Sequence, residues 1–209
     1  MYNVPSIANK RKANEAFWLW IGIHALLSTR TLWFDSNLIQ NFSTQINQTL
    51  NIIINYFFIG CIQWLILRRY FPKITRWIWL TIIANLIIIL ADRWFNLYHR
   101  EWTYEESIIK YVFLNFVITV TFSTFIGSIQ SFAFKNYVRK SHFWIVAYFI
   151  QGILQGFFIE SLLYFLSVLG LENIADLIIK YDIAYILIFT TIAIIPQALI
   201  LRRFVAEYQ

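Results

Sequence analysis

The chain has 209 residues, of which 59% are hydrophobic and 13% are charged, and its formal net charge is +6. A water-soluble domain of this size could not bury so much apolar surface. The composition therefore excludes an ordinary soluble domain and predicts an all-α integral membrane protein.

Six apolar runs predict six transmembrane helices, because each approaches or exceeds the roughly 18 to 20 residues that a helix needs to cross a bilayer. In chain order the runs cover residues 16–34, 48–67, 77–95, 108–134, 143–170 and 183–201. Their connections are too short to hold a soluble domain, so residues 1–209 form one membrane domain. The first run resembles a signal peptide but lacks a small-residue cleavage site, so we expect it to be retained. Its removal would leave five spans.

Lysine and arginine collect on alternate connections, and 12 of the 17 basic residues fall on one predicted side. Cytoplasmic loops retain positive charge, so this side is cytoplasmic and both termini lie there. The net charge is then a signal of membrane orientation, and no nucleic-acid partner is needed to explain it. The residues expected to anchor the ends of the inward-running helices are Arg68, Arg69, Lys135, Arg202 and Arg203.

A short motif recurs at even spacing along the chain. The sequence QWLILRR at 63–69 returns as QALILRR at 197–203, and a weaker copy, QSFAFKN, lies at 130–136. The glutamines that open the three copies are 67 residues apart. Such a fixed period indicates structural repeats related by an axis along the membrane normal. The chain is therefore predicted to be three tandem two-helix repeats, at about 10–69, 76–136 and 143–203.

Tryptophan opens the outward helix of each predicted repeat. The offset of 67 carries Trp77 onto Trp144, and it also carries Gly60 onto Gly127. In the first repeat, Trp18 and Trp20 match the WIW sequence at 77–79 with an offset of 59, so we expect a shorter first unit.

Each repeated glutamine lies five residues before a basic residue, which is about 7.5 Å deeper along a helix. An unpaired amide at that depth is costly, so it must bond a neighbouring helix or line a wet cavity. Gln63, Gln130 and Gln197 are therefore either interhelical fasteners or the lining of a polar vestibule at the cytoplasmic side.

The glutamine, leucine-rich run and arginine doublet, followed by a basic loop and a tryptophan-led helix, resemble a group of poorly characterised multi-pass membrane proteins common in cyanobacteria. The resemblance covers the second to sixth spans and rests on a short motif. It implies a plasma or thylakoid membrane and contact with photosynthetic complexes. Mitochondrial carriers also have three two-helix repeats, but their repeated proline and acid signature is absent from this sequence.

Charged and small residues within the spans are further candidates for a site. Arg30, Asp92, Arg93 and Glu160 are predicted to form an outer-leaflet charge cluster, either as salt bridges between helices or as an ion or substrate site. Gly152 and Gly156 form a GxxxG pair, which predicts close approach of another helix.

Signatures of catalysis and of metal sites are missing from the sequence. The three histidines fall at different predicted depths, and no HExxH, GxSxG or Walker A pattern occurs. His24 could hold a pigment magnesium, although an isolated histidine in a helix is more often packed or hydrogen-bonded. We expect no enzyme activity and identify no cofactor.

Two functions remain from the sequence. The high aromatic content, 20% of residues, favours an accessory or scaffold subunit that binds lipid, pigment or a larger membrane complex. The alternative is a small transporter or channel in which the repeated glutamines line the path.

Overall fold

The computed structural model describes residues 7–34, 45–98, 108–157 and 182–208 of the chain. These residues form six helices and contain no strand. The helices are α1 (Ile7–Phe34), α2 (Gln45–Leu67), α3 (Arg76–Tyr98), α4 (Ile108–Phe134), α5 (Phe143–Gln155) and α8 (Asp182–Tyr208). The predicted all-α class is thus confirmed.

Within the described residues, two helices contain stretches that are long and apolar enough to cross a membrane, namely residues 113–134 of α4 and 187–208 of α8. Shorter apolar stretches cover residues 56–67 of α2, 76–88 of α3 and 143–155 of α5. The structure therefore confirms a helical chain with two candidate spanning helices.

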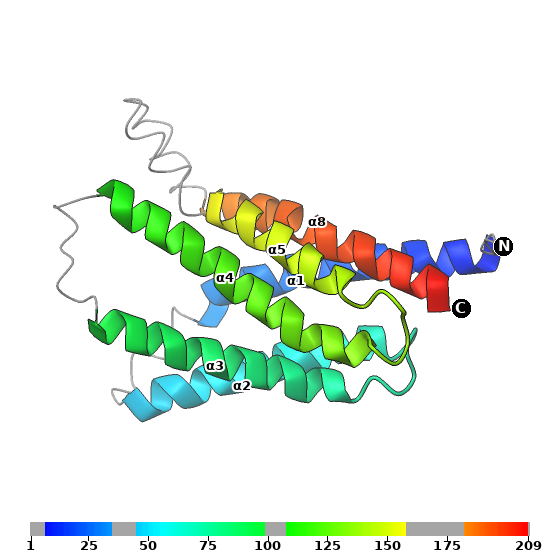
Figure 1. Ribbon diagram of the computed structural model, residues 1–209, viewed down its shortest axis with the longest axis horizontal. Helices are drawn as coiled ribbons and strands as arrows, with labels where there is room; N and C mark the ends of the chain where they lie inside the picture. Colours follow the sequence, from blue (N-terminus) through cyan, green and yellow to red (C-terminus); the bar gives the residue numbers. More distant parts are fainter. Residues whose placement is uncertain (1–6, 35–44, 99–107, 158–181, 209) are drawn as a thin grey trace.

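The helices lie roughly side by side, and both chain termini lie at one end of the bundle (Figure 1). The same end holds the α2–α3 connection at 68–75 and the α4–α5 connection at 135–142. We call it the loop end. Each helix packs against its neighbours around the bundle, in the pairs α1 with α2, α2 with α3, α3 with α4, α4 with α5, α5 with α8, and α8 with α1. Each pair joins a helix that arrives at the loop end to one that leaves it.

The two connections at the loop end fold in the same way despite different sequences, YFPKI and YVRKS at their centres. Tyr70 and Phe71 both donate their backbone N–H to the Leu67 carbonyl, at 3.0 and 2.8 Å. Sixty-seven residues later, Tyr137 and Val138 donate to the Phe134 carbonyl at 2.9 and 3.0 Å. Equal backbone geometry at equal spacing shows that the periodic sequence produces a periodic structure here.

The burial of apolar side chains stabilises this turn, because its apolar residues point into the bundle. Phe71 is fully buried and Val138 is 2% exposed. The ring of Tyr70 is also buried, and this burial, with the Glu15 carboxylate nearby, raises the pKa of Tyr70 to about 12. The Tyr70 hydroxyl is therefore neutral at physiological pH.

A hydrophobic cluster of buried side chains gathers at the loop end. The cluster contains residues spaced by 67 positions, because Leu67, Phe134 and Leu201 all belong to it and are each fully buried. In the last helix the chain does not turn after Leu201, and α8 continues to Tyr208 beside the start of α1. Phe204 and Val205 are also fully buried, and they occupy the places in the cluster that turn residues occupy at the other two connections. The two chain ends thus take the place of a third connection.

Candidate functional site: a ring of tryptophan and glutamine

Three buried tryptophans meet at the centre of the bundle near the loop end. Trp20 of α1, Trp77 of α3 and Trp144 of α5 are each 0% exposed. Their ring centroids are 6.1 Å apart for Trp20 and Trp77, and 5.7 Å apart for the other two pairs. All three pairs meet edge to face, the arrangement that aromatic rings prefer. Three helices are thereby joined through three mutual aromatic contacts.

Each of these indoles donates its N–H to one of the repeated glutamines. Trp77 Nε1 donates to Gln63 Oε1 at 3.2 Å, and Trp144 Nε1 donates to Gln130 Oε1 at 3.3 Å. Both pairs are 14 residues apart and span a loop-end connection. The third pair joins the two ends of the chain, because Trp20 Nε1 donates to Gln197 Oε1 at 3.1 Å.

The other end of each glutamine amide bonds a second odd-numbered helix. Gln63 Nε2 lies 2.9 Å from His24 Nε2 on α1, and Gln130 Nε2 donates to Thr81 Oγ1 on α3 at 2.9 Å. Gln197 Nε2 donates to Gln151 Oε1 on α5. Each glutamine on an even-numbered helix therefore connects two odd-numbered helices.

These six bonds form a closed circuit. It runs from α1 through Gln63 to α3, through Gln130 to α5, and through Gln197 back to α1. We call Trp20, Trp77, Trp144, Gln63, Gln130 and Gln197 the Trp–Gln ring. Polar bonds in an apolar surround are retained because breaking one leaves both groups unpaired.

The ring fixes the hydrogen positions of His24. Gln63 Oε1 accepts from Trp77, so the amide nitrogen faces His24 and donates. The receiving Nε2 then carries no proton, and the proton lies on Nδ1, which donates to the Trp20 carbonyl at 2.8 Å. His24 is thus neutral, and both ring nitrogens are occupied within the protein. Neither is free to ligate a pigment magnesium.

The three repeated glutamines are buried and lie close to one another in the bundle. The structure brings Gln63, Gln130 and Gln197 together at one level, where they are 4%, 1% and 0% exposed. Their amides bond tryptophans and polar side chains, as interhelical fasteners do. The vestibule alternative would require these amides to face water, and in this structure they do not.

The structure corrects the alignment of the first repeat. Trp20 matches Trp77, with an offset of 57, because both belong to the ring. Trp18 and Trp79 are instead 68% and 66% exposed. The predicted offset of 59 is therefore wrong, since it pairs exposed Trp18 with buried Trp77 and buried Trp20 with exposed Trp79.

Sequence reasoning missed the residues that receive the second bond of each glutamine. His24 and Thr81 each lie four residues after a ring tryptophan. The third receiver, Gln151, lies seven residues after Trp144. Only His24 and Thr81 share the spacing of four, which is one helical turn, and the three residue types differ, so no common pattern marks the receivers.

The glycines of the predicted GxxxG pair lie against α4. A Cβ on Gly152 would come within 2.9 Å of the Ser123 Cβ and the Val120 Cα, and one on Gly156 within 2.8 Å of the Phe116 ring. A larger residue at either position would push α4 and α5 apart.

The basic residues at the loop end are exposed. Arg68 lies over the Trp64 ring and Arg203 over the Phe143 ring, each at 4.9 Å, and Arg69 pairs with Glu15 at 3.2 Å. Lys135 and Arg202 are exposed as well. The predicted charge cluster of Arg30, Asp92, Arg93 and Glu160 lies outside the residues whose side chains the structure describes.

The described part of the chain contains no group of three or more histidine, cysteine or acidic residues that could hold a metal ion. Comparison of the chain with protein-family models, with curated protein sequences and with solved structures finds no match.

Proposed function

We propose that the chain is a six-span membrane protein built from three tandem two-helix repeats, with both termini in the cytoplasm. The distribution of polar and apolar side chains supports this. Between the ends of the helices, large apolar residues face outward, and polar residues such as Gln130, Thr81 and Asn85 are buried. Among the outward residues are Leu26, Phe58, Leu90, Phe113, Phe125 and Ile188. Lipid suits such a surface, and water does not.

Cysteine labelling tests this topology, because the chain contains a single cysteine, Cys61. In a Cys61→Ser background, we expect Lys73→Cys and Lys140→Cys to react with a membrane-impermeant maleimide only after the cells are permeabilised. Glu105→Cys should react in intact cells. Labelling of Lys73→Cys and Lys140→Cys from opposite sides would contradict the repeat topology.

Within this membrane protein, the role supported best is that of a non-enzymatic accessory or scaffold subunit. The observation that carries it is the completed Trp–Gln ring. The repeated polar groups bond one another and hold the helices together, so the outward apolar surface is left for contact with lipid, pigment or a larger membrane complex. The plasma membrane or a thylakoid membrane is the expected location.

A small transporter or channel is the second candidate, and one observation favours it. Outside the six bonds of the ring, the interior contains further polar side chains, since Asn85 and Ser123 are 7% and 8% exposed. Buried polar groups inside a membrane bundle often mark a pathway. In that case the ring would be a closed gate, and opening it would require several of its hydrogen bonds to break together.

Purification and flux measurements separate the two functions. A scaffold should co-migrate with a larger complex after mild solubilisation, or carry bound pigment visible by absorbance, and reconstituted vesicles should show no flux above protein-free vesicles. Gln130→Leu removes two ring bonds and should loosen the complex by destabilising the bundle. Ion or solute flux in wild-type vesicles that Gln130→Leu increases by weakening the gate, with no complex and no pigment, would instead establish the transport function.

A further inference from the structure

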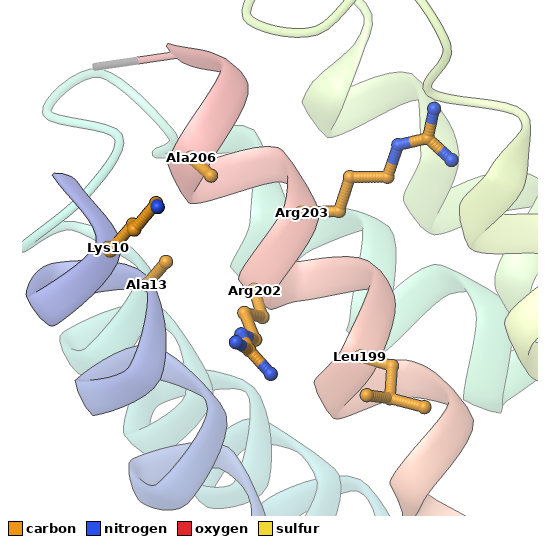
Figure 2. A pocket seen from close by; sticks show the side chains of 6 residues that line it. All are labelled: Lys10, Ala13, Leu199, Arg202, Arg203 and Ala206. Carbon is orange, nitrogen blue, oxygen red and sulfur yellow. The ribbon is translucent and has the colours of Figure 1, made fainter. Parts of the chain in front are cut away.

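An open groove lies between α1 and α8 at the loop end. Its volume is about 470 Å³, and it is lined by Lys10, Ala13, Leu199, Arg202, Arg203 and Ala206 (Figure 2). Alanines from both helices leave room where the helices face each other. Arg202 extends from α8 into this space and Lys10 flanks it from α1, whereas Arg203 points away from it (Figure 2). The groove thus has two cations, Lys10 and Arg202, near small apolar side chains of both helices.

Three other cations at the loop end have contacts of their own. Arg68 and Arg203 stack on aromatic rings, and Arg69 pairs with Glu15. Among the described residues, neither Lys10 nor Arg202 has an acidic partner within ion-pair distance. Glu207, the acid nearest in sequence on α8, does not line the groove. Two like charges that face one space repel each other, and a bound anion would remove that repulsion.

The remaining residue of the lining, Leu199, indicates where an apolar part of the bound anion would lie. Leu199 lies one helical turn before Arg203 and is 48% exposed, so the groove passes from charged groups to an outward apolar side chain. A phosphate ester attached to a hydrocarbon chain matches this order of groups. A volume of this size also falls within the range of small-molecule sites.

We propose that this groove binds a phosphate group, with Lys10 and Arg202 as its ligands, and that the phosphate is the headgroup of an anionic phospholipid. Arginine suits the site because its guanidinium can bond two phosphate oxygens at once. The lipid assignment rests on the proposed membrane insertion, which the cysteine labelling tests separately. A soluble phosphate would use the same two cations.

Native mass spectrometry of the full-length protein, released from nanodiscs of phosphatidylcholine and phosphatidylglycerol, tests the proposal. We expect wild type to retain phosphatidylglycerol over phosphatidylcholine by about tenfold or more, because each basic residue near an anionic lipid adds about fivefold in affinity. The double variant Lys10→Gln/Arg202→Gln should lose this preference. Arg202→Lys, which keeps the charge, should retain most of it.

The matched control is Lys73→Gln/Lys135→Gln, which removes the same charge from two exposed residues at the loop end that do not line the groove. It should bind like wild type, and circular dichroism should show equal helix content for all variants. Equal loss in the control would overturn the site, as would absence of lipid preference in wild type together with no binding of inorganic phosphate. If millimolar inorganic phosphate binds and displaces the lipid, the site stands and its ligand is soluble. If phosphate does not displace it, the ligand is the lipid.

Discussion

Trp77→Ala should destabilise the protein by about 3–5 kcal/mol, the range for deleting a fully buried large aromatic side chain. Trp77 is 0% exposed, and its ring contacts Trp20, Trp144 and Phe134. The substitution opens a cavity at the centre of the bundle and leaves the Gln63 carbonyl without its donor. Unfolding in detergent, followed by the loss of helical circular dichroism, measures the change.

Trp79→Ala is the control for this experiment, because it makes the same change two residues along the same helix. Trp79 is 66% exposed, so its removal should change stability by about 0.5 kcal/mol or less. Trp77→Phe separates the two contributions, since it keeps an aromatic ring and removes the N–H. Equal destabilisation by Trp77→Ala and Trp79→Ala would refute the central position of the ring.

Gly127→Ala should destabilise the protein by about 1–3 kcal/mol, the usual cost of overpacking a core. A Cβ at this position would lie 2.5 Å from the Tyr148 Cβ and 2.8 Å from its Cγ. Atoms so near the backbone cannot rotate away, so α4 and α5 would have to separate. Their separation would strain the bond from Trp144 to Gln130.

Gly60→Ala makes the identical change 67 residues earlier and should be neutral or slightly stabilising. The nearest atoms to its added Cβ are Thr81 Cβ and Cγ2 at 3.5 Å, an ordinary contact, and alanine favours a helix over glycine by about 1 kcal/mol. Thermal unfolding of both variants in one detergent provides the comparison. Comparable losses of stability in both would show that packing against Tyr148 is not the cause.

The sequence predicted the helical class and showed that five of the six ring residues recur with one period. Gln63, Gln130 and Gln197 were identified by their period, and Trp77 and Trp144 by the same offset. The period could be recognised because the same tryptophan–glutamine bond is made three times, and each copy requires nearly the same residues. The choice between fastener and vestibule required coordinates, because the period shows that the amides are equivalent but not which groups they face.

The first tryptophan could not be assigned from sequence because the pattern WxW occurs in both α1 and α3. Two residues along a helix turn a side chain by about 200°, so one tryptophan of each pair must face inward and the other outward. Only packing shows that Trp20 and Trp77 face inward. The partners of the glutamines were hidden for another reason, since histidine and threonine perform one role with unlike side chains.

The bond from Trp20 to Gln197 joins residues 177 positions apart, whereas the other two tryptophan bonds span 14. During synthesis, the first helix therefore enters its environment long before its partner exists. Until α8 arrives, the Trp20 indole N–H has no Gln197 to receive it, and the circuit remains open at one point. Assembly of this bundle is consequently completed only when the last helix has been made, and a nascent chain that lacks it carries an unpaired donor at its centre.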